Sequence, residues 1–114
     1  MLGGVGVQAM DGIAASLSGL STAAQSIALS ANNVANLNST GYRAESLVQE
    51  TLPQGGVYGA AMQQSQAGLD PGGGNVDLAT EAVNLDLQGT AYQADLKFLQ
   101  VQNNLLGTAL DLKA

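Results

Sequence analysis

Residues 10–34 read MDGIAASLSGLSTAAQSIALSANNV, and this stretch decides the fold. Apolar or small residues recur along it at alternating spacings of three and four, so they share one face of a helix. The positions are Met10, Ile13, Leu17, Leu20, Ala24, Ile27, Ala31 and Val34. A stripe of this kind is typical of a helix that lies along another helix. The sequence therefore predicts a long helix over about residues 6–37.

The same stretch is rich in alanine and serine, and Asp11 is its one charged residue. Small side chains allow a neighbouring backbone to approach closely. A helix exposed to water normally carries Lys and Glu on its outer face, and this one does not. We therefore expect several of its faces to contact protein. A Ser/Ala-rich linker is the alternative, which the sustained heptad pattern disfavours.

A second stripe of the same period runs through the end of the chain. Its members are Leu78, Ala82, Leu85, Gly89, Tyr92, Leu96, Leu99, Asn103, Leu106 and Leu110. It predicts a helix over about residues 76–112, packed against the first as an antiparallel coiled-coil hairpin in a mainly α fold. A second apolar line lies beside the stripe and comprises Val76, Val83, Leu87, Phe98, Val101, Leu105 and Leu112. One partner helix cannot cover both lines, so the surplus indicates self-association or a larger partner.

Turn-forming residues separate the two helices. The cluster Asn36, Asn38, Ser39, Thr40 and Gly41 is expected to end the first helix. The following segment is rich in glycine and holds both prolines, and two short strands over residues 44–52 and 56–66 can pair there as a β-hairpin. Residues 70–74 are typical of a flexible connection, and Asn75 is the expected cap of the second helix. The chain thus divides into residues 1–43, 44–74 and 75–114 within a single domain.

Composition excludes several classes of function. The formal charge is −6, and Arg43, Lys97 and Lys113 are the only cationic residues, too few to neutralise a phosphate backbone. We expect no nucleic-acid partner and, for the same reason, no binding to anionic membrane surfaces. No apolar run approaches the roughly 20 residues of a spanning helix, so we expect no membrane insertion. The first residues lack the basic flank and apolar block of a cleaved signal peptide.

The sequence offers few candidate catalytic or metal-binding residues. The chain contains no histidine and no cysteine, which removes the usual members of hydrolase triads and zinc sites. Its glycine runs lack the Lys-Ser or Lys-Thr of a phosphate-binding loop. Asp77 and Glu81 lie four residues apart and could bind a cation, but a solvated first helical turn is the favoured interpretation. We expect no enzyme activity, no cofactor and no metal.

Residues 32–42, NNVANLNSTGY followed by Arg43, resemble the signature that closes the first helix of bacterial flagellar rod and hook proteins, NNIANxNTxGY followed by Lys or Arg. Three later stretches resemble the C-terminal helix of that family in the same order: NVDLATEAVNL at 75–85, AYQADLK at 91–97 and LLGT at 105–108. The resemblance covers roughly the first 43 and the last 40 residues. The middle is too short for the outer domains of hook or distal rod members, so the chain is most similar to a small proximal rod protein.

The resemblance implies an axial structural subunit of the flagellar basal body, located in the periplasmic rod and exported by the flagellar type III apparatus without a cleaved signal. Its partners would be copies of itself, other rod subunits and the export apparatus. The alternative is a divergent paralogue that acts as a helical adaptor or chaperone-like binding module. The residues expected to carry assembly and packing are Ile13, Leu17, Leu20, Ile27, Asn33, Val34, Asn36, Gly41, Tyr42, Leu78, Leu85, Tyr92, Leu96, Phe98, Leu99, Leu106 and Leu110.

Overall fold

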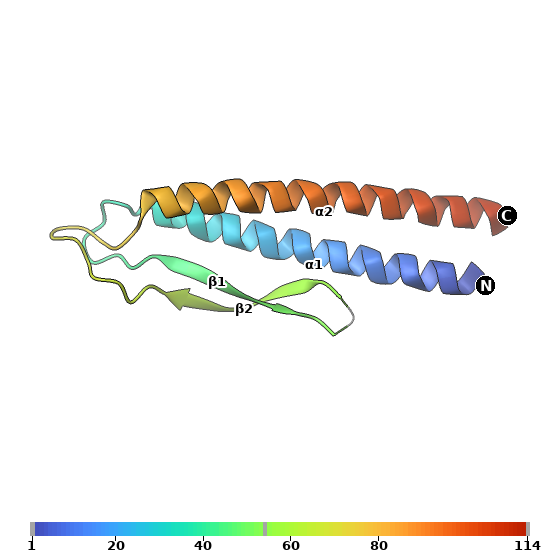
Figure 1. The fold of residues 1–114 in the computed structure, drawn as a ribbon, viewed down its shortest axis with the longest axis horizontal. Helices are drawn as coiled ribbons and strands as arrows, with labels where there is room; N and C mark the ends of the chain where they lie inside the picture. The colour runs from blue at the N-terminus through green and yellow to red at the C-terminus, as the bar shows by residue number, and fades with distance from the viewer. Residues whose placement is uncertain (1, 54, 114) are drawn as a thin grey trace.

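A computed structural model describes residues 2–53 and 55–113, with side chains over 12–53 and 55–112. The elements in chain order are α1 (Leu2–Ala35), β1 (Glu45–Thr51), β2 (Val57–Gln64) and α2 (Leu78–Lys113). The two helices run antiparallel, so both chain ends lie at one end of the molecule, and the strands lie beside α1 (Figure 1). The prediction of a mainly α fold with two long helices and a central β-hairpin is confirmed.

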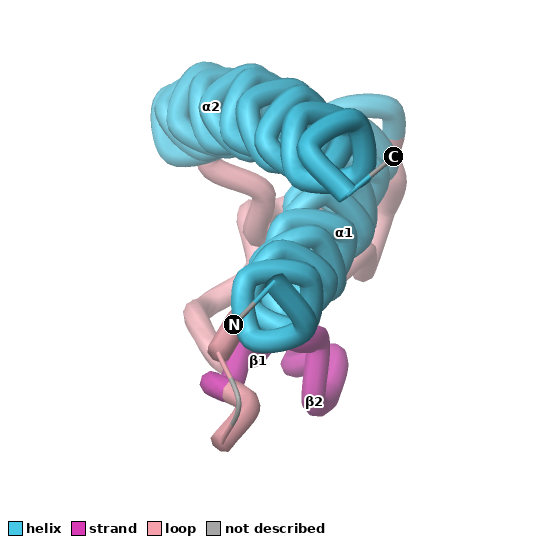
Figure 2. Tube along the Cα trace, turned by 90° about the vertical axis from the view of Figure 1, so that its right-hand side faces the viewer, coloured by secondary structure: helices cyan, strands magenta, loops and turns pink. Residues whose placement is uncertain are grey.

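The molecule is an elongated rod of 67 × 22 × 14 Å. Its radius of gyration is 18.8 Å, whereas a compact domain of this length has about 13 Å. Seen along its length, α1 lies between α2 on one side and the two strands on the other (Figure 2). α1 is therefore the central element, because it contacts α2, β1 and β2.

The ends of the elements differ from the sequence prediction by a few residues. α1 begins at Leu2 instead of 6 and ends at Ala35, and α2 begins at Leu78. The predicted cap was wrong: the Asp77 Oδ1 caps α2 by accepting from the amides of Ala79 at 3.0 Å and Thr80 at 3.4 Å. Val76, expected on the exposed apolar line of the helix, is instead buried just before the helix begins.

The two strands form an antiparallel ladder from Glu45↔Gln64 to Thr51↔Val57. The register shifts between Val48 and Gln49, which pair with Ala61 and Gly59, so one residue of β2 bulges out of the ladder. At the tip, Gly56 has a φ of 93°, and a Cβ there would lie 3.0 Å from the Cα of Ala15 on α1. Glycine is therefore needed where the hairpin tip meets the helix.

Small and polar side chains fill the contact between the two helices. Within residues 12–53, the buried positions of α1 are Ser16, Thr22, Ala23, Ser30 and Asn33. A Cβ at Gly12 would meet the side chain of Gln102, and one at Gly19 would meet Asp95, so this part of α1 faces α2. The expected close approach through small residues is thus present.

The face of α1 that packs on α2 is not the predicted one. Gly12, Ser16, Gly19, Ala23 and Ser30 share a face by their spacing, and each lies one position before a residue of the predicted stripe. In that stripe Leu17 is 51% exposed, and Ala24 and Ala31 are also exposed. The prediction was wrong by one residue because glycine and serine give no hydrophobic signal. Met10 lies outside the described side chains.

The hairpin is attached to α1 through polar bonds at the first residue of each strand. Val57 opens β2: its carbonyl accepts from Thr22 Oγ1 at 3.2 Å, and its amide donates to Ser18 Oγ at 3.3 Å. Glu45 opens β1, and the side chain of Asn33 binds both of its backbone groups. Side-chain amides and hydroxyls of α1 therefore satisfy the backbone N–H and C=O groups of the first residue in each strand.

Candidate functional site

The amide of Asn33 is the centre of a junction between α1, β1 and α2. Its Nδ2 donates to the carbonyl of Glu45 at 2.8 Å and to Glu81 Oε1 at 3.0 Å. Its Oδ1 accepts from the amide of Glu45 and from the hydroxyl of Tyr42, each at 2.9 Å. Asn33 is 0% exposed, and all four of its hydrogen-bonding positions are used. A single side chain thus ties the end of one helix to the beginning of the other.

Tyr42 supports this junction from the turn that follows α1. Its hydroxyl also accepts from Asn32 Nδ2 at 3.0 Å. Burial raises the pKa of Tyr42 above its ordinary value of 10.0, and the carboxylates of Glu45 and Glu81 raise it further, against a smaller lowering by the bond from Asn32. The neutral hydroxyl that donates to Asn33 is therefore maintained across the neutral range.

The other residues of the 32–42 motif close the turn itself. Asn36 Nδ2 donates to the carbonyl of Asn32 at 2.9 Å. Gly41 has a φ of 76°, and its amide donates to the carbonyl of Gly73 at 2.9 Å. A Cβ at Gly74 would overlap the carbonyl oxygen of Tyr42, so the chain before α2 passes directly over this turn. The structure joins Asn33 to Tyr42 and places Asn36 and Gly41 in the adjoining turn, while their predicted role in assembly stays a prediction.

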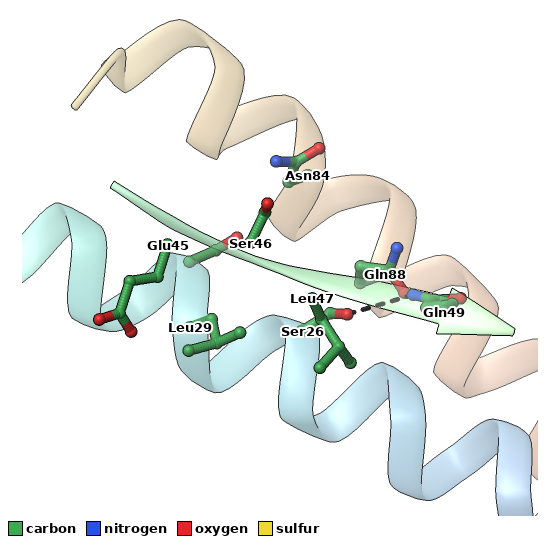
Figure 3. A pocket seen from close by; sticks show the side chains of 9 residues that line it. Ser26, Leu29, Glu45, Ser46, Leu47, Gln49, Asn84 and Gln88 are labelled. Atoms are coloured by element: carbon green, nitrogen blue, oxygen red, sulfur yellow. Dashed lines mark hydrogen bonds between the residues drawn. The ribbon is translucent and has the colours of Figure 1, made fainter. Parts of the chain in front are cut away.

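Polar side chains from three elements line a cavity of about 180 Å³ beside the junction. Ser26 and Ser30 come from α1, Glu45, Ser46 and Gln49 from β1, and Asn84 and Gln88 from α2 (Figure 3). Gln49 Nε2 donates to Ser26 Oγ at 3.3 Å across it. This bond joins β1 to α1 across the cavity.

The sequence did not predict that Glu81 is buried. The solvated first turn expected for Asp77 and Glu81 was wrong for Glu81, which is 5% exposed, whereas Asp77 is exposed. The cause is the contact with Asn33, 48 positions earlier in the chain. Local sequence pattern carries no information about a contact of that separation.

The predicted packing residues divide into two groups by burial. Ile13, Leu20, Ile27, Val34, Leu85, Leu99 and Leu106 are half-buried. Leu17, Leu78, Tyr92, Leu96, Phe98 and Leu110 are exposed, by between 38% and 59%. The second group is thus not covered within one chain and remains available to a partner.

The apolar surface of α2 lies on both flanks of its contact with α1. Val83, Leu87, Phe98, Val101, Leu105 and Leu112 are 54–75% exposed. At about 100° per residue they fall within an arc of roughly 60°, and we call them the outer line. The exposed members of the predicted stripe lie on the opposite flank and are Leu78, Tyr92, Leu96 and Leu110. Relative to Asp95 and Gln102, which face α1, the two groups lie about 90° to either side.

The back of α2, between these flanks, is polar. Its exposed residues include Asp86, Gln93, Lys97, Gln100 and Asn104. α2 therefore has one face against α1, two apolar flanks that are exposed in the single chain, and one exposed polar face. This arrangement, together with the Asn33 junction, is the candidate functional site.

Comparison with models of known protein families gives no match, and comparison with curated proteins gives none either. Neither described helix combines the length and the apolar character needed to cross a membrane. Within the described ranges, no three metal-ligating side chains are grouped so that they could hold an ion. The functional interpretation therefore rests on the geometry of the chain and on the resemblance of its two end segments.

Proposed function

We propose that this chain is a structural subunit of the bacterial flagellar rod, which assembles through its two long helices. The observation that carries the proposal is the pair of apolar flanks on α2. A two-fold dimer formed through one flank would leave the other in water. Two flanks per helix suit a subunit that has a neighbour on each side, as in a tube or filament.

The exposed area supports the same proposal. The chain exposes 7293 Å², whereas a compact protein of 11.4 kDa exposes about 5,800 Å². The excess of roughly 1,500 Å² exceeds the about 800 Å² that one partner contributes to a standard interface. It is enough surface for two neighbours, and ten of the large exposed apolar residues lie on α2.

The role in the flagellum comes from the resemblance of residues 32–43 and 75–108. In that role the chain occupies the periplasmic part of the basal body, reaches it through the flagellar export apparatus and contacts copies of itself and other rod subunits. It carries out no catalysis. The Asn33 junction lies within the first motif, and it would present α2 at a fixed angle to its neighbours.

The decisive experiment is mass spectrometry of purified basal bodies, combined with a swimming assay of a deletion strain. We expect the chain in the rod fraction and loss of swimming on deletion. The matched control is the deletion strain complemented with the wild-type gene. Absence from the rod together with normal swimming would contradict the proposal.

A helical adaptor is the second candidate, and one observation favours it. The polar cavity beside the junction and the exposed hairpin offer specific contacts to a single partner, beyond what a tube needs. An adaptor would form a defined complex of fixed stoichiometry in solution. Analytical ultracentrifugation with increasing concentration separates the two, because a rod subunit should continue to grow and an adaptor should not.

A further inference from the structure

A second cavity, of about 290 Å³, opens at the beginning of α2 next to the one in Figure 3. The two cavities share Glu45, Ser46 and Asn84. Its volume is just below the about 300–1,000 Å³ of pockets for small molecules. It has room for one side chain.

Glu81 lines this cavity, and one of its two carboxylate oxygens has no hydrogen-bond partner within the part of the chain that the structure describes. Glu81 Oε1 accepts from Asn33, but Oε2 is buried and has no hydrogen-bond partner among the described residues. Glu81 as a whole is 5% exposed. A buried charged oxygen with no donor is costly, so a donor supplied from outside would stabilise it.

The surroundings favour a cationic donor. Three of the nine acidic residues, Glu45, Asp77 and Glu81, line the cavity. Arg43 lies near its wall, but its Nη1 donates to the carbonyls of Ser65 at 3.0 Å and Ala67 at 3.2 Å. The described residues form no three-ligand metal site, which directs the inference to an N–H donor.

We propose that this cavity binds one basic side chain, an arginine guanidinium or a lysine ammonium, from a neighbouring protein chain. The cation pairs with the carboxylate of Glu81, whose Oε2 lacks a donor among the described residues, and is further attracted by Asp77 and Glu45. The chain's formal charge of −6 suits a basic partner. This proposal does not depend on the rod function, because a helical adaptor could bind a basic side chain in the same cavity.

The test is an NMR titration of the full chain with ethylguanidinium chloride, which reproduces the end of an arginine, against sodium chloride at equal ionic strength. We expect saturable shifts at the amides of Glu81 and Asn84. Glu81→Gln keeps an oxygen for Asn33 but removes the charge, and should weaken binding about tenfold or more. Asp86→Asn removes the same charge from the back of α2 and should leave binding unchanged.

Two outcomes would overturn the proposal. One is the absence of saturable shifts, as expected if an ordered water already satisfies Oε2. The other is equal binding by the wild type and Glu81→Gln. Arg43→Gln provides a further check, because binding that develops only in this variant would mean that Arg43 itself fills the cavity in solution.

A cysteine cross-link identifies the source of the basic side chain. The chain has no cysteine, so Thr80→Cys at the rim of the cavity and Lys97→Cys can be mixed as separate proteins. A disulfide between them, with ethylguanidinium binding intact, assigns the side chain to a second copy. Binding without that disulfide excludes Lys97 of a second copy as the source.

Discussion

Asn33 shows how one polar residue can determine a local fold. It satisfies both backbone groups of Glu45, a carboxylate of α2 and the Tyr42 hydroxyl, and it does so from a fully buried position. A hydrophobic residue of similar size could fill the space but would leave these groups unpaired. Leaving these buried groups without hydrogen bonds would cost free energy, so the junction favours asparagine at this position.

Asn33→Ala should lower the free energy of unfolding by about 3 kcal/mol or more, because several buried groups lose their partner together. Asn38→Ala is the matched control, since Asn38 is exposed in the following turn. Urea unfolding followed by circular dichroism measures both. Equal, small losses in the two variants would show that the junction contributes little to stability.

The titration of Tyr42 makes the stability of the fold depend on pH above about pH 10. Its pKa in the folded state lies above the 10.0 of the unfolded chain, so its contribution to stability is fully present below pH 10 and is lost as the pH rises through the folded pKa. Tyr42→Phe should remove this loss and also cost about 1–2 kcal/mol at neutral pH, because Asn33 Oδ1 loses a donor.

Ring signals in NMR spectra give the titration of each tyrosine separately. Tyr58 is the comparison, because its hydrogen bond to Glu50 at 2.8 Å, with the charge of Glu50, also raises its pKa. Tyr58 is on the surface, so high salt should reduce its shift, while the shift of Tyr42, caused mainly by burial, should persist. A Tyr42 midpoint at or below 10 would contradict the raised pKa of this half-buried side chain.

At the scale of the element, the α1–α2 contact depends on small residues. Ala23→Leu would place a large side chain where Ala23 is 3% exposed, and should destabilise the chain by about 1–3 kcal/mol. Ala24→Leu makes the same change one position on, at an exposed site, and should alter stability by less than about 0.5 kcal/mol. Urea midpoints of the two variants check this directly. A larger loss at Ala24 would support the face predicted from the sequence.

The elements themselves were predictable because their signals are local. Period-3.6 patterning marks both helices, and the glycines and prolines of residues 44–74 mark the hairpin. The strand bounds differ from Glu45–Thr51 and Val57–Gln64 by no more than two residues at each end. The buried face of α1 was not predictable, because Gly12, Ser16 and Gly19 have no apolar pattern.

The candidate site could be predicted only in part, for a related reason. The NNVANLNSTGY motif pointed to Asn33, Asn36, Gly41 and Tyr42, and the structure joins Asn33 to Tyr42 and places the other two in the adjoining turn. Glu81 and the cavity around it arise from a contact between distant positions, which periodicity does not report. Of the large apolar residues in the predicted stripes, Leu17, Leu78, Tyr92, Leu96 and Leu110 remain exposed in the single chain, and the other described ones are half-buried.

At the scale of the whole molecule, the two helices differ in how far the rest of the chain covers them. α1 is covered on two sides, by α2 and by the hairpin, whereas α2 is covered only by α1. In a monomer, the two flanks of α2 are exposed apolar strips along a rod 67 Å long. Association should bury them, with roughly 25 cal/mol gained for each Å² removed from water.

Val101→Glu tests whether association uses the outer line. Val101 is 54% exposed, so a charge there should leave the monomer folded but place a carboxylate against apolar surface in any assembly. A charge at Leu99 is less informative, because that side chain is half-buried against α1 and its loss would also disturb the fold. We expect Val101→Glu to reduce self-association at least tenfold in sedimentation equilibrium and to abolish swimming.

Gln100→Glu is the matched control for this change. It adds the same charge at the neighbouring position, which is exposed and lies about 100° around the helix from the outer line. It should therefore associate as the wild type does, at the same ionic strength, and support swimming. Equal loss of association in the two variants would mean that net charge controls assembly, whereas loss in Val101→Glu alone identifies the outer line as the surface on which the next subunit packs.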